Sequence, residues 1–165
     1  SITSPHGEAC RTCWEAKEGY RLVGVDASSI QLRVLAHYMG DKRYVEEVAS
    51  GDVHTYNRKA LGIDSRDDAK TFIKEEHYAL SAYLQGGESI IMKKALVMLT
   101  DRAKAIDYKL VAFVHDEWQF EVHPNQAEEL GQLAVQCIID AGVYFNLRCP
   151  LDGEYKVGSN WAETH

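Results

Sequence analysis

The pattern of apolar and polar residues changes its period early in the chain, at an acidic residue. Residues 22–25 form a short apolar run of the length of a buried strand, and Asp26 follows it directly. From Ile30 onward the apolar residues recur at helical spacing, with Ser28 or Ser29 available as the helix N-cap. The pattern predicts a strand, a carboxylate at its end and a helix. Such a carboxylate is costly unless it is solvated, paired or bound to a cation, so Asp26 is a candidate site residue.

A second acidic residue has the same kind of setting. Residues 110–114 are apolar, residues 115–117 are polar, and residues 118–122 alternate between apolar and polar. This pattern predicts a β-hairpin with a polar tip, and a single tip of this kind is most often just a solvated turn. If Asp26 and Asp116 lie on neighbouring strands, however, their carboxylates converge into an oxygen-rich site for hard divalent cations such as Mg²⁺.

The rest of the chain predicts mostly helices. Residues 1–19 are a polar lead-in that we expect to lie on the surface. Helical patterns cover residues 42–49, 52–61, 65–73, 76–105 and 124–144. Residues 149–157 predict a last strand, and Pro150 near its start suits an edge position. This order predicts an α+β domain whose antiparallel β-sheet is backed by helices on one face.

Length and composition are those of one globular domain. The chain has 165 residues, of which 45% are hydrophobic, enough to fill a core. No apolar run approaches 18 residues and no secretion signal is apparent, so we expect a cytosolic protein without a membrane partner. Cys10 and Cys13 form a C-x-x-C pair, but a zinc or redox site would need a second pair or a βαβ context, so plain thiols are favoured.

Two short segments resemble motifs of the family A DNA polymerases, the bacterial polymerase I type. Residues 26–33, DASSIQLR, resemble motif A, and residues 115–117, HDE, resemble motif C. Further similar segments follow the family order at residues 51–55, 66–72, 84–87 and 158–161. The resemblance is closest to the bacteriophage branch and extends from about residue 3 to residue 165, which would place the protein in the cytoplasm of a bacterial host.

The resemblance implies a polymerase palm and a two-metal site. Asp26 and Asp116 would be the catalytic acids and would hold two Mg²⁺ ions, for which Mn²⁺ can substitute, with the carbonyl of Ala27 as a further metal ligand. The partners would be primer–template DNA and deoxynucleoside triphosphates, and a primer 3′-hydroxyl would attack the nucleotide's α-phosphorus. Proteins that bind duplex DNA usually carry a basic surface, whereas this chain has a net charge of −7. We therefore expect that it does not bind duplex DNA as a free-standing protein, or that the basic parts lie on segments it lacks.

Four residues are implied to bind the incoming nucleotide. Arg66, Lys70 and His54 match positions that contact the triphosphate, for which fixed cationic donors are suitable. Without the resemblance, Arg66 and Lys70 would be read as the charged face of a solvated helix. Gln31 stands where the family usually has a glutamate that discriminates against a ribose 2′-hydroxyl. An amide can still form a hydrogen bond but carries no charge.

Three residues are implied to contact DNA. Gln85 matches a glutamine that reads the minor groove, although a glutamine near a helix N-terminus is more often only solvated. His115 and Glu117 flank the second acid in the segment that resembles motif C.

The family pattern breaks at residues 73–77, where about a hundred residues of the fingers would follow. We interpret this segment as a junction across a deletion, so that the chain is a single palm domain over residues 1–165, without most of the fingers or a thumb, and inactive by itself. The alternatives are a non-catalytic folding scaffold derived from a palm and a metal-dependent nuclease. A nuclease would need a further carboxylate, for which Glu117 is the obvious candidate.

Overall fold

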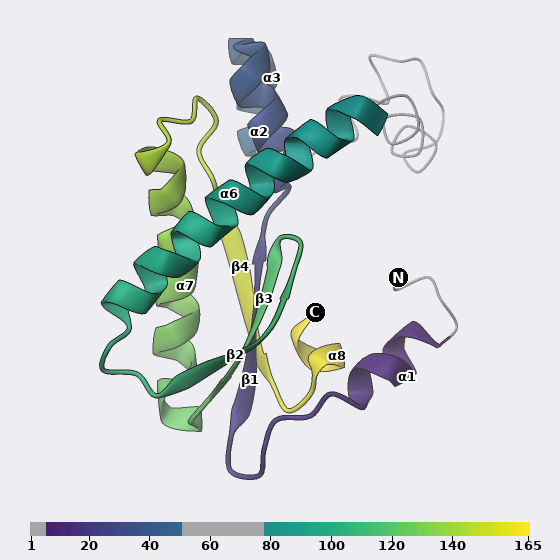
Figure 1. Ribbon diagram of the computed structural model, residues 1–165, viewed down its shortest axis with the longest axis vertical. Coiled ribbons are helices and arrows are strands. Elements are labelled where there is room, and N and C mark those ends of the chain that lie inside the picture. Colours follow the sequence, from purple (N-terminus) through teal and green to yellow (C-terminus); the bar gives the residue numbers. More distant parts are fainter. Residues whose placement is uncertain (1–5, 51–77) are drawn as a thin grey trace.

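A four-stranded antiparallel sheet organises the fold in the computed structural model, which describes residues 6–50 and 78–165 (Figure 1). The strands are β1 (Arg21–Ala27), β2 (Tyr108–Val114), β3 (Glu117–Val122) and β4 (Gly153–Gly158). Their spatial order is β2-β3-β1-β4, and every neighbouring pair is antiparallel. The predicted α+β class with an antiparallel sheet is therefore confirmed, as are the strand before Asp26 and the hairpin.

Helices surround the sheet and connect its strands. The described helices are α1 (Gly7–Thr12), α2 (Ile30–Met39), α3 (Lys42–Ser50), α6 (Tyr78–Arg102), the short 3₁₀ helix η1 (Pro124–Gln126), α7 (Ala127–Tyr144) and α8 (Trp161–Thr164). The helices predicted at 42–49, 76–105 and 124–144 are present with small shifts at their ends. Those predicted at 52–61 and 65–73, and the junction at 73–77, lie outside the described residues.

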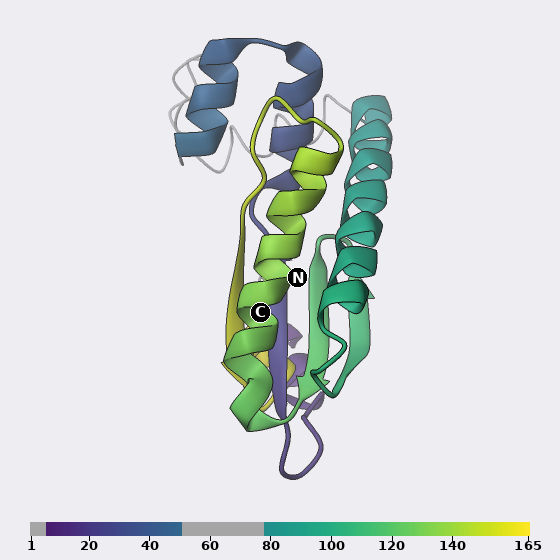
Figure 2. The same ribbon diagram turned by 90° about the vertical axis from the view of Figure 1, so that its left-hand side faces the viewer.

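The main core lies between one face of the sheet and the two long helices. Alternation turns Val23 and Val25 of β1 and Trp118 and Phe120 of β3 toward this core, and all four are fully buried. Figure 2 shows α6 and α7 running beside each other along the sheet. Helix α7 packs its small and apolar residues onto β1 and β4, and Gly131 allows the close approach, because a Cβ there would lie 2.3 Å from the ring of Tyr155.

The opposite face of the sheet carries the short helix α8, which the sequence did not predict. Gly24 of β1 provides the space, because a Cβ at this position would lie 2.2 Å from the carbonyl oxygen of Thr164 in α8. The polar lead-in also contains a helix, α1, which packs on α8. Trp14, two residues after the end of α1, makes an edge-to-face contact with Trp161 of α8. The sequence predicted that helices would cover one face of the sheet. This holds for the long helices α6 and α7, whereas α8 lies on the opposite face.

The last strand begins four residues later than predicted, although it does lie at an edge of the sheet. Residues 149–152 form a loop whose apolar side chains pack on helices. Cys149 packs with buried residues of α2 and α3, and Leu151 lies against Gly142 of α7. Arg33 on α2, itself buried, donates a hydrogen bond to the carbonyl oxygen of Pro150. The loop is therefore held by α2 and α7 rather than by a ladder of strand hydrogen bonds.

The other edge strand, β2, is unusually apolar on its outer surface. Leu110, Val111 and Val114 are each 40–51% exposed. Leu110 pairs with Phe120 of β3, and Ala112 pairs with the neighbouring residue Gln119. Val111 therefore has no partner in the register and is the extra residue of a β-bulge.

Candidate functional site

Asp26 lies near the end of β1 on the face of the sheet that α6 and α7 leave open. Its neighbours Val25 and Ala27 are buried in the core, so strand alternation turns the half-buried Asp26 side chain to the opposite face. In the sheet register Asp26 pairs with Glu117 on β3 and with Glu154 on β4. One acidic residue therefore flanks Asp26 on each side.

Asp116 lies in the two-residue turn between β2 and β3, directly beside the end of β1. The turn is tight, because Val114 pairs with Glu117 and His115 adopts a left-handed backbone conformation with φ of 55°. The backbone N–H of Ala27 donates a hydrogen bond to the carbonyl oxygen of Asp116, at 3.1 Å. The structure thus brings the two predicted acids and Ala27 together.

The electrostatic setting of Asp26 is that of a carboxylate among other carboxylates. Burial, followed by the charges of Asp116, Glu117 and Glu154, raises the pKa of Asp26 from 3.8 to about 6, and His165 opposes this shift. A nearby cation would relieve both the burial cost and the repulsion. Within residues 6–50 and 78–165, however, no group of three or more His, Cys, Asp or Glu side chains is arranged as a complete metal site.

Glu117 is held by the protein itself. Its carboxylate accepts hydrogen bonds from Gln119 Nε2 and Trp161 Nε1, both at 2.6 Å, and contacts His165 Nδ1 at 2.6 Å. Only 6% of Glu117 is exposed. Its oxygens are therefore occupied by donors from β3 and α8, and Glu117 anchors the end of the chain to the sheet beside Asp26.

A cavity of about 240 Å³ lies on this open face between the sheet and α8. Asp26, Glu117 and Glu154 line it together with Lys156 and His165. Lys156 Nζ donates a hydrogen bond to the carbonyl oxygen of His165, at 3.0 Å. The cavity therefore holds Asp26 and its two acidic neighbours on the sheet, next to one lysine.

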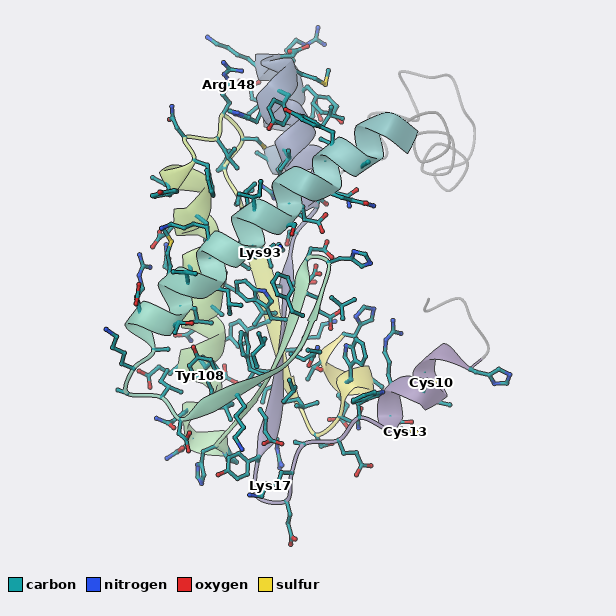
Figure 3. The ribbon with its side chains drawn as sticks, in the orientation of Figure 1. Cys10, Cys13, Lys17, Lys93, Tyr108 and Arg148 are labelled. Carbon is teal, nitrogen blue, oxygen red and sulfur yellow. The ribbon has the colours of Figure 1, made fainter. Side chains whose placement is uncertain are left out.

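A second cavity, of about 260 Å³, lies between α6 and the β2–β3 hairpin. The predicted DNA-contacting residues Gln85 and His115 both line it, although they come from different elements. Glu88, Lys93 and Phe113 are also among its lining residues. Figure 3 shows Lys93 on the middle of α6. The structure thus places Gln85 and His115 together, next to the turn that carries Asp116.

Gln31 lies in the first turn of α2, after the bend at Ser28 and Ser29. Ser29 takes the N-cap position, but its backbone carbonyl rather than its side chain accepts the first helical hydrogen bonds. The side chain of Gln31 donates from Nε2 to Glu88 Oε2 on α6, at 2.8 Å. Burial raises the pKa of Glu88, the hydrogen bond from Gln31 lowers it, and the charge of Asp116 raises it. Glu88 therefore lies close to the acid site.

Three charged residues of this region, Glu88, Glu154 and His165, were not named from the sequence. Glu88 lies on the buried stripe of α6, between Leu84 and Ile91. A charged residue on an otherwise apolar helix stripe is the feature of the sequence that could have identified Glu88 as a site residue. His54, Arg66 and Lys70, predicted to bind the triphosphate, lie outside the described residues. Cys10 and Cys13 are exposed free thiols at α1 (Figure 3).

In the described residues, no helix has both the length and the apolar character required to cross a membrane.

Comparison with protein families matches residues 55–163 to the model of DNA polymerase family A. Among curated proteins, the chain is 24% identical to the DNA-directed DNA polymerase of Enterobacteria phage T3 over 99% of its length and 37% of the relative. The DNA-directed DNA polymerase of Escherichia phage T7 gives the same identity and coverage. The chain thus spans little more than a third of the length of these relatives, and the expected likeness to the bacteriophage branch is confirmed.

Among solved structures, the chain is similar to the POL domain of Pol1 from M. smegmatis in complex with DNA primer-template and dNTP. The TM-score is 0.80 at 19% sequence identity, and the match covers 99% of this chain and 44% of that chain. This likeness confirms the predicted palm type of fold.

Proposed function

The chain belongs to DNA polymerase family A, and on this basis we propose that it is the palm of a DNA-directed DNA polymerase and that Asp26 and Asp116 are its catalytic acids. The observation that carries the proposal is the direct contact between the end of β1 and the β2–β3 turn, which places both acids at one point of the sheet. The raised pKa of Asp26 fits a carboxylate that is poised for a cation.

The donors at this point suit a hard divalent cation. Asp26 and Asp116 supply carboxylate oxygens, and the carbonyl of Ala27 is a further oxygen ligand in the proposal. When bound, two Mg²⁺ or Mn²⁺ ions neutralise developing charge and lower the pKa of an attacking hydroxyl. Because Mg²⁺ is commonly held by one or two carboxylates together with substrate phosphates, two protein acids are sufficient.

The proposed reaction is nucleotidyl transfer. The 3′-oxygen of a primer forms a bond to the α-phosphorus of a deoxynucleoside triphosphate, the bond to the β,γ-pyrophosphate breaks, and the proton of the 3′-hydroxyl is released to solvent. Asp26 and Asp116 orient the reacting groups, and Glu117 keeps the adjacent strand and α8 in place. His54, Arg66 and Lys70 are proposed to hold the triphosphate, and Gln31 to face the sugar.

Gln85 and His115 are proposed to contact the primer–template. Both line the cavity beside the acid-bearing turn, where hydrogen-bonding side chains can meet a nucleic acid. The proposed role of Glu117 in DNA binding is indirect, because its oxygens already accept hydrogen bonds from the protein.

We further propose that the chain is a single palm domain with a fingers deletion at residues 73–77 and that it does not extend primers by itself. The alignment with the phage T3 polymerase spans 262 residues, more than the 165 of this chain, so the relative has residues that this chain lacks. Positioning contributes about 7–11 kcal/mol to catalysis of this kind, and a palm without most of the fingers lacks residues that would hold the nucleotide in line with the primer.

The proposal is tested by Mn²⁺ binding and by primer extension. Electron paramagnetic resonance of free Mn²⁺ should show binding to the chain that is lost in Asp26→Asn and in Asp116→Asn, but kept in Asp107→Asn, an exposed control. No extension of a labelled primer is expected, even with protein in excess. Mn²⁺ binding that survives both acid substitutions would contradict the assignment of the site, and extension that depends on both acids would contradict the proposed inactivity.

The same assays separate the alternatives. A folding scaffold would bind no Mn²⁺ at these acids. A nuclease would cleave the labelled duplex, but the carboxylate that this function was expected to use, Glu117, is already occupied by Gln119 and Trp161.

A further inference from the structure

The two exposed cysteines of the chain lie close together in sequence at the end of α1. Cys10 belongs to the helix and Cys13 is its C-cap residue (Figure 3). Both are free thiols, and both are exposed, whereas Cys137 and Cys149 are fully buried. The chain therefore carries one accessible pair of thiols, together with two buried thiols that serve as an internal reference.

Helical spacing brings the two accessible cysteines within reach of a disulfide. Residues three apart on an α-helix have Cα atoms about 5 Å apart, and disulfides join residues whose Cα atoms are about 4.4–6.8 Å apart. The Cβ atoms, which are about 5–6 Å apart in a regular helix, must approach each other by roughly 1–2 Å. Cys13 is suited to this movement because it ends the helix, so no further helical turn holds it in place.

The hydrogen bond that a disulfide would break is a replaceable one. The thiol of Cys13 donates to the carbonyl oxygen of Ala9, at 3.3 Å. Thr12 Oγ1 donates to the same oxygen, at 2.8 Å. The carbonyl of Ala9 therefore keeps a partner when the thiol of Cys13 is oxidised.

The residue that follows Cys13 joins this turn to α8. The backbone N–H of Trp14 donates to the carbonyl oxygen of Arg11 at 3.1 Å, and the Trp14 carbonyl oxygen accepts from the N–H of Trp161 at 2.9 Å. The two indole rings meet edge to face, with centroids 6.5 Å apart. A movement of the last turn of α1 therefore reaches Trp14 and its contacts with α8.

We propose that Cys10 and Cys13 form a dithiol site that a low-molecular-weight disulfide oxidises reversibly, and that the resulting disulfide alters the packing of Trp14 on α8. The sequence favours plain thiols because it shows neither the further ligands of a zinc site nor the βαβ setting of a redox enzyme. An intramolecular disulfide requires neither, since it needs only accessible thiols at a suitable distance. The site is independent of the proposed function.

The reaction consists of two thiol–disulfide exchanges with a disulfide such as glutathione disulfide. One cysteine thiolate attacks a sulfur of glutathione disulfide, so that a mixed disulfide forms and one glutathione thiolate leaves. The second cysteine thiolate then attacks the protein sulfur of the mixed disulfide and releases the second glutathione. The protein loses two protons and two electrons, glutathione disulfide is reduced to two glutathione molecules, and excess glutathione reverses the exchange.

The test equilibrates the folded chain with rising glutathione disulfide at about 1 mM glutathione, followed by acid quenching, alkylation of the remaining thiols after unfolding, and mass spectrometry. The parent chain should lose two hydrogens, keep two alkylatable thiols and carry no glutathione. Cys13→Ser lacks the second exchange, so a single glutathione adduct should accumulate at Cys10. Half-modification of this variant should require about tenfold more glutathione disulfide or higher, because the parent's second thiol acts at a high effective concentration.

Tryptophan fluorescence tests the effect on α8. Oxidation should change the emission of the parent chain, and the change should be smaller in Trp14→Phe, because Trp118 is buried in the core and takes no part. The double variant Cys10→Ser/Cys13→Ser is the matched control. Its emission should be the same at every ratio of glutathione disulfide to glutathione.

The other outcomes contradict defined parts of the inference. A parent chain that takes up two glutathione adducts, or that keeps all four thiols at every ratio, would show that the two cysteines do not act as a pair. A disulfide that forms without any change in tryptophan emission would contradict the effect on α8.

Discussion

The backbone N–H of Ala27 donates a hydrogen bond to the carbonyl oxygen of Asp116, across 3.1 Å. This bond joins the end of β1 to the β2–β3 turn and fixes the positions from which Asp26 and Asp116 extend. Because it involves only main-chain atoms, a substitution of either carboxylate should leave the other acid in place. Variants of the two acids therefore report on charge and ligation rather than on a rearranged site.

Asp26→Asn should make the metal-free protein more stable near neutral pH. The pKa of Asp26 is raised in the folded state to about 6, so between pH 4 and pH 6 the folded protein binds more protons than the unfolded chain. Stability due to this group is present below pH 4 and is lost as the pH rises through 6. With allowance for solvent screening of a half-buried group, the loss amounts to about 1–2 kcal/mol.

Urea unfolding with a chelator at pH 4, 5, 6 and 7 measures this effect as the difference between the parent chain and Asp26→Asn. The difference should be small at pH 4 and should reach its full size at pH 7. Asp107→Asn, at an exposed position, should show no such trend. A difference that is the same at every pH would show that the carboxyl of Asp26 is not destabilised by folding.

Mn²⁺ binding at the acid site should weaken as the pH falls. A carboxylate must be deprotonated to bind a metal, so the apparent affinity should fall about tenfold per pH unit below the pKa of Asp26, which is about 6. Titrations of free Mn²⁺ at pH 5, 6 and 7 measure this change. Binding that is independent of pH in this range would mean that the ion is held elsewhere.

Glu117→Ala should destabilise the fold by about 2–4 kcal/mol, since it leaves donors of Gln119, Trp161 and His165 without an acceptor. Chemical denaturation gives the magnitude, and hydrogen exchange of the α8 amides shows whether α8 has detached. Glu121→Ala, the next acidic position on the same face of β3, is the comparison and should cost less, because its one described bond is to the exposed backbone of Lys17. Equal costs for the two variants would argue against an anchoring role of Glu117.

Gly24→Ala should destabilise the protein by about 2–3 kcal/mol, because the new Cβ would lie 2.2 Å from the backbone carbonyl of Thr164. Gly86→Ala is the matched control: nothing lies within 4 Å of a Cβ on this helical residue, and the substitution should stabilise the protein by about 0.5–1 kcal/mol. Thermal unfolding of both variants decides the matter. A neutral Gly24→Ala would show that α8 can move away from the sheet without cost.

Much of the fold follows from periodicity, because the pattern of a strand or a long helix is local. The strand before Asp26, the hairpin around Asp116 and the helices α6 and α7 each carry their own pattern over many residues. The short helices α1 and α8 do not, since their stability comes from contacts such as Trp14 with Trp161. The late start of β4 was missed for a similar reason: apolar residues before it pack on distant helices.

The candidate site divides in the same way. Asp26 and Asp116 were predictable because each follows an apolar run, and a resemblance to known motifs joined them. Glu154 becomes a neighbour of Asp26 only through the register of β1 with β4, and Glu88 meets Gln31 only because α6 crosses α2. Such pairs depend on strand register and on the path of a helix, neither of which is encoded in a local pattern.

The apolar outer edge of β2 has a consequence for how the protein behaves in concentrated solution. An open strand edge offers unpaired backbone groups to any other strand, and Leu110, Val111 and Val114 would add apolar contacts to such a pairing. The bulge at Val111 interrupts the regular spacing of those backbone groups and twists the edge. We therefore expect the bulge to disfavour regular pairing of this edge with a strand of another molecule.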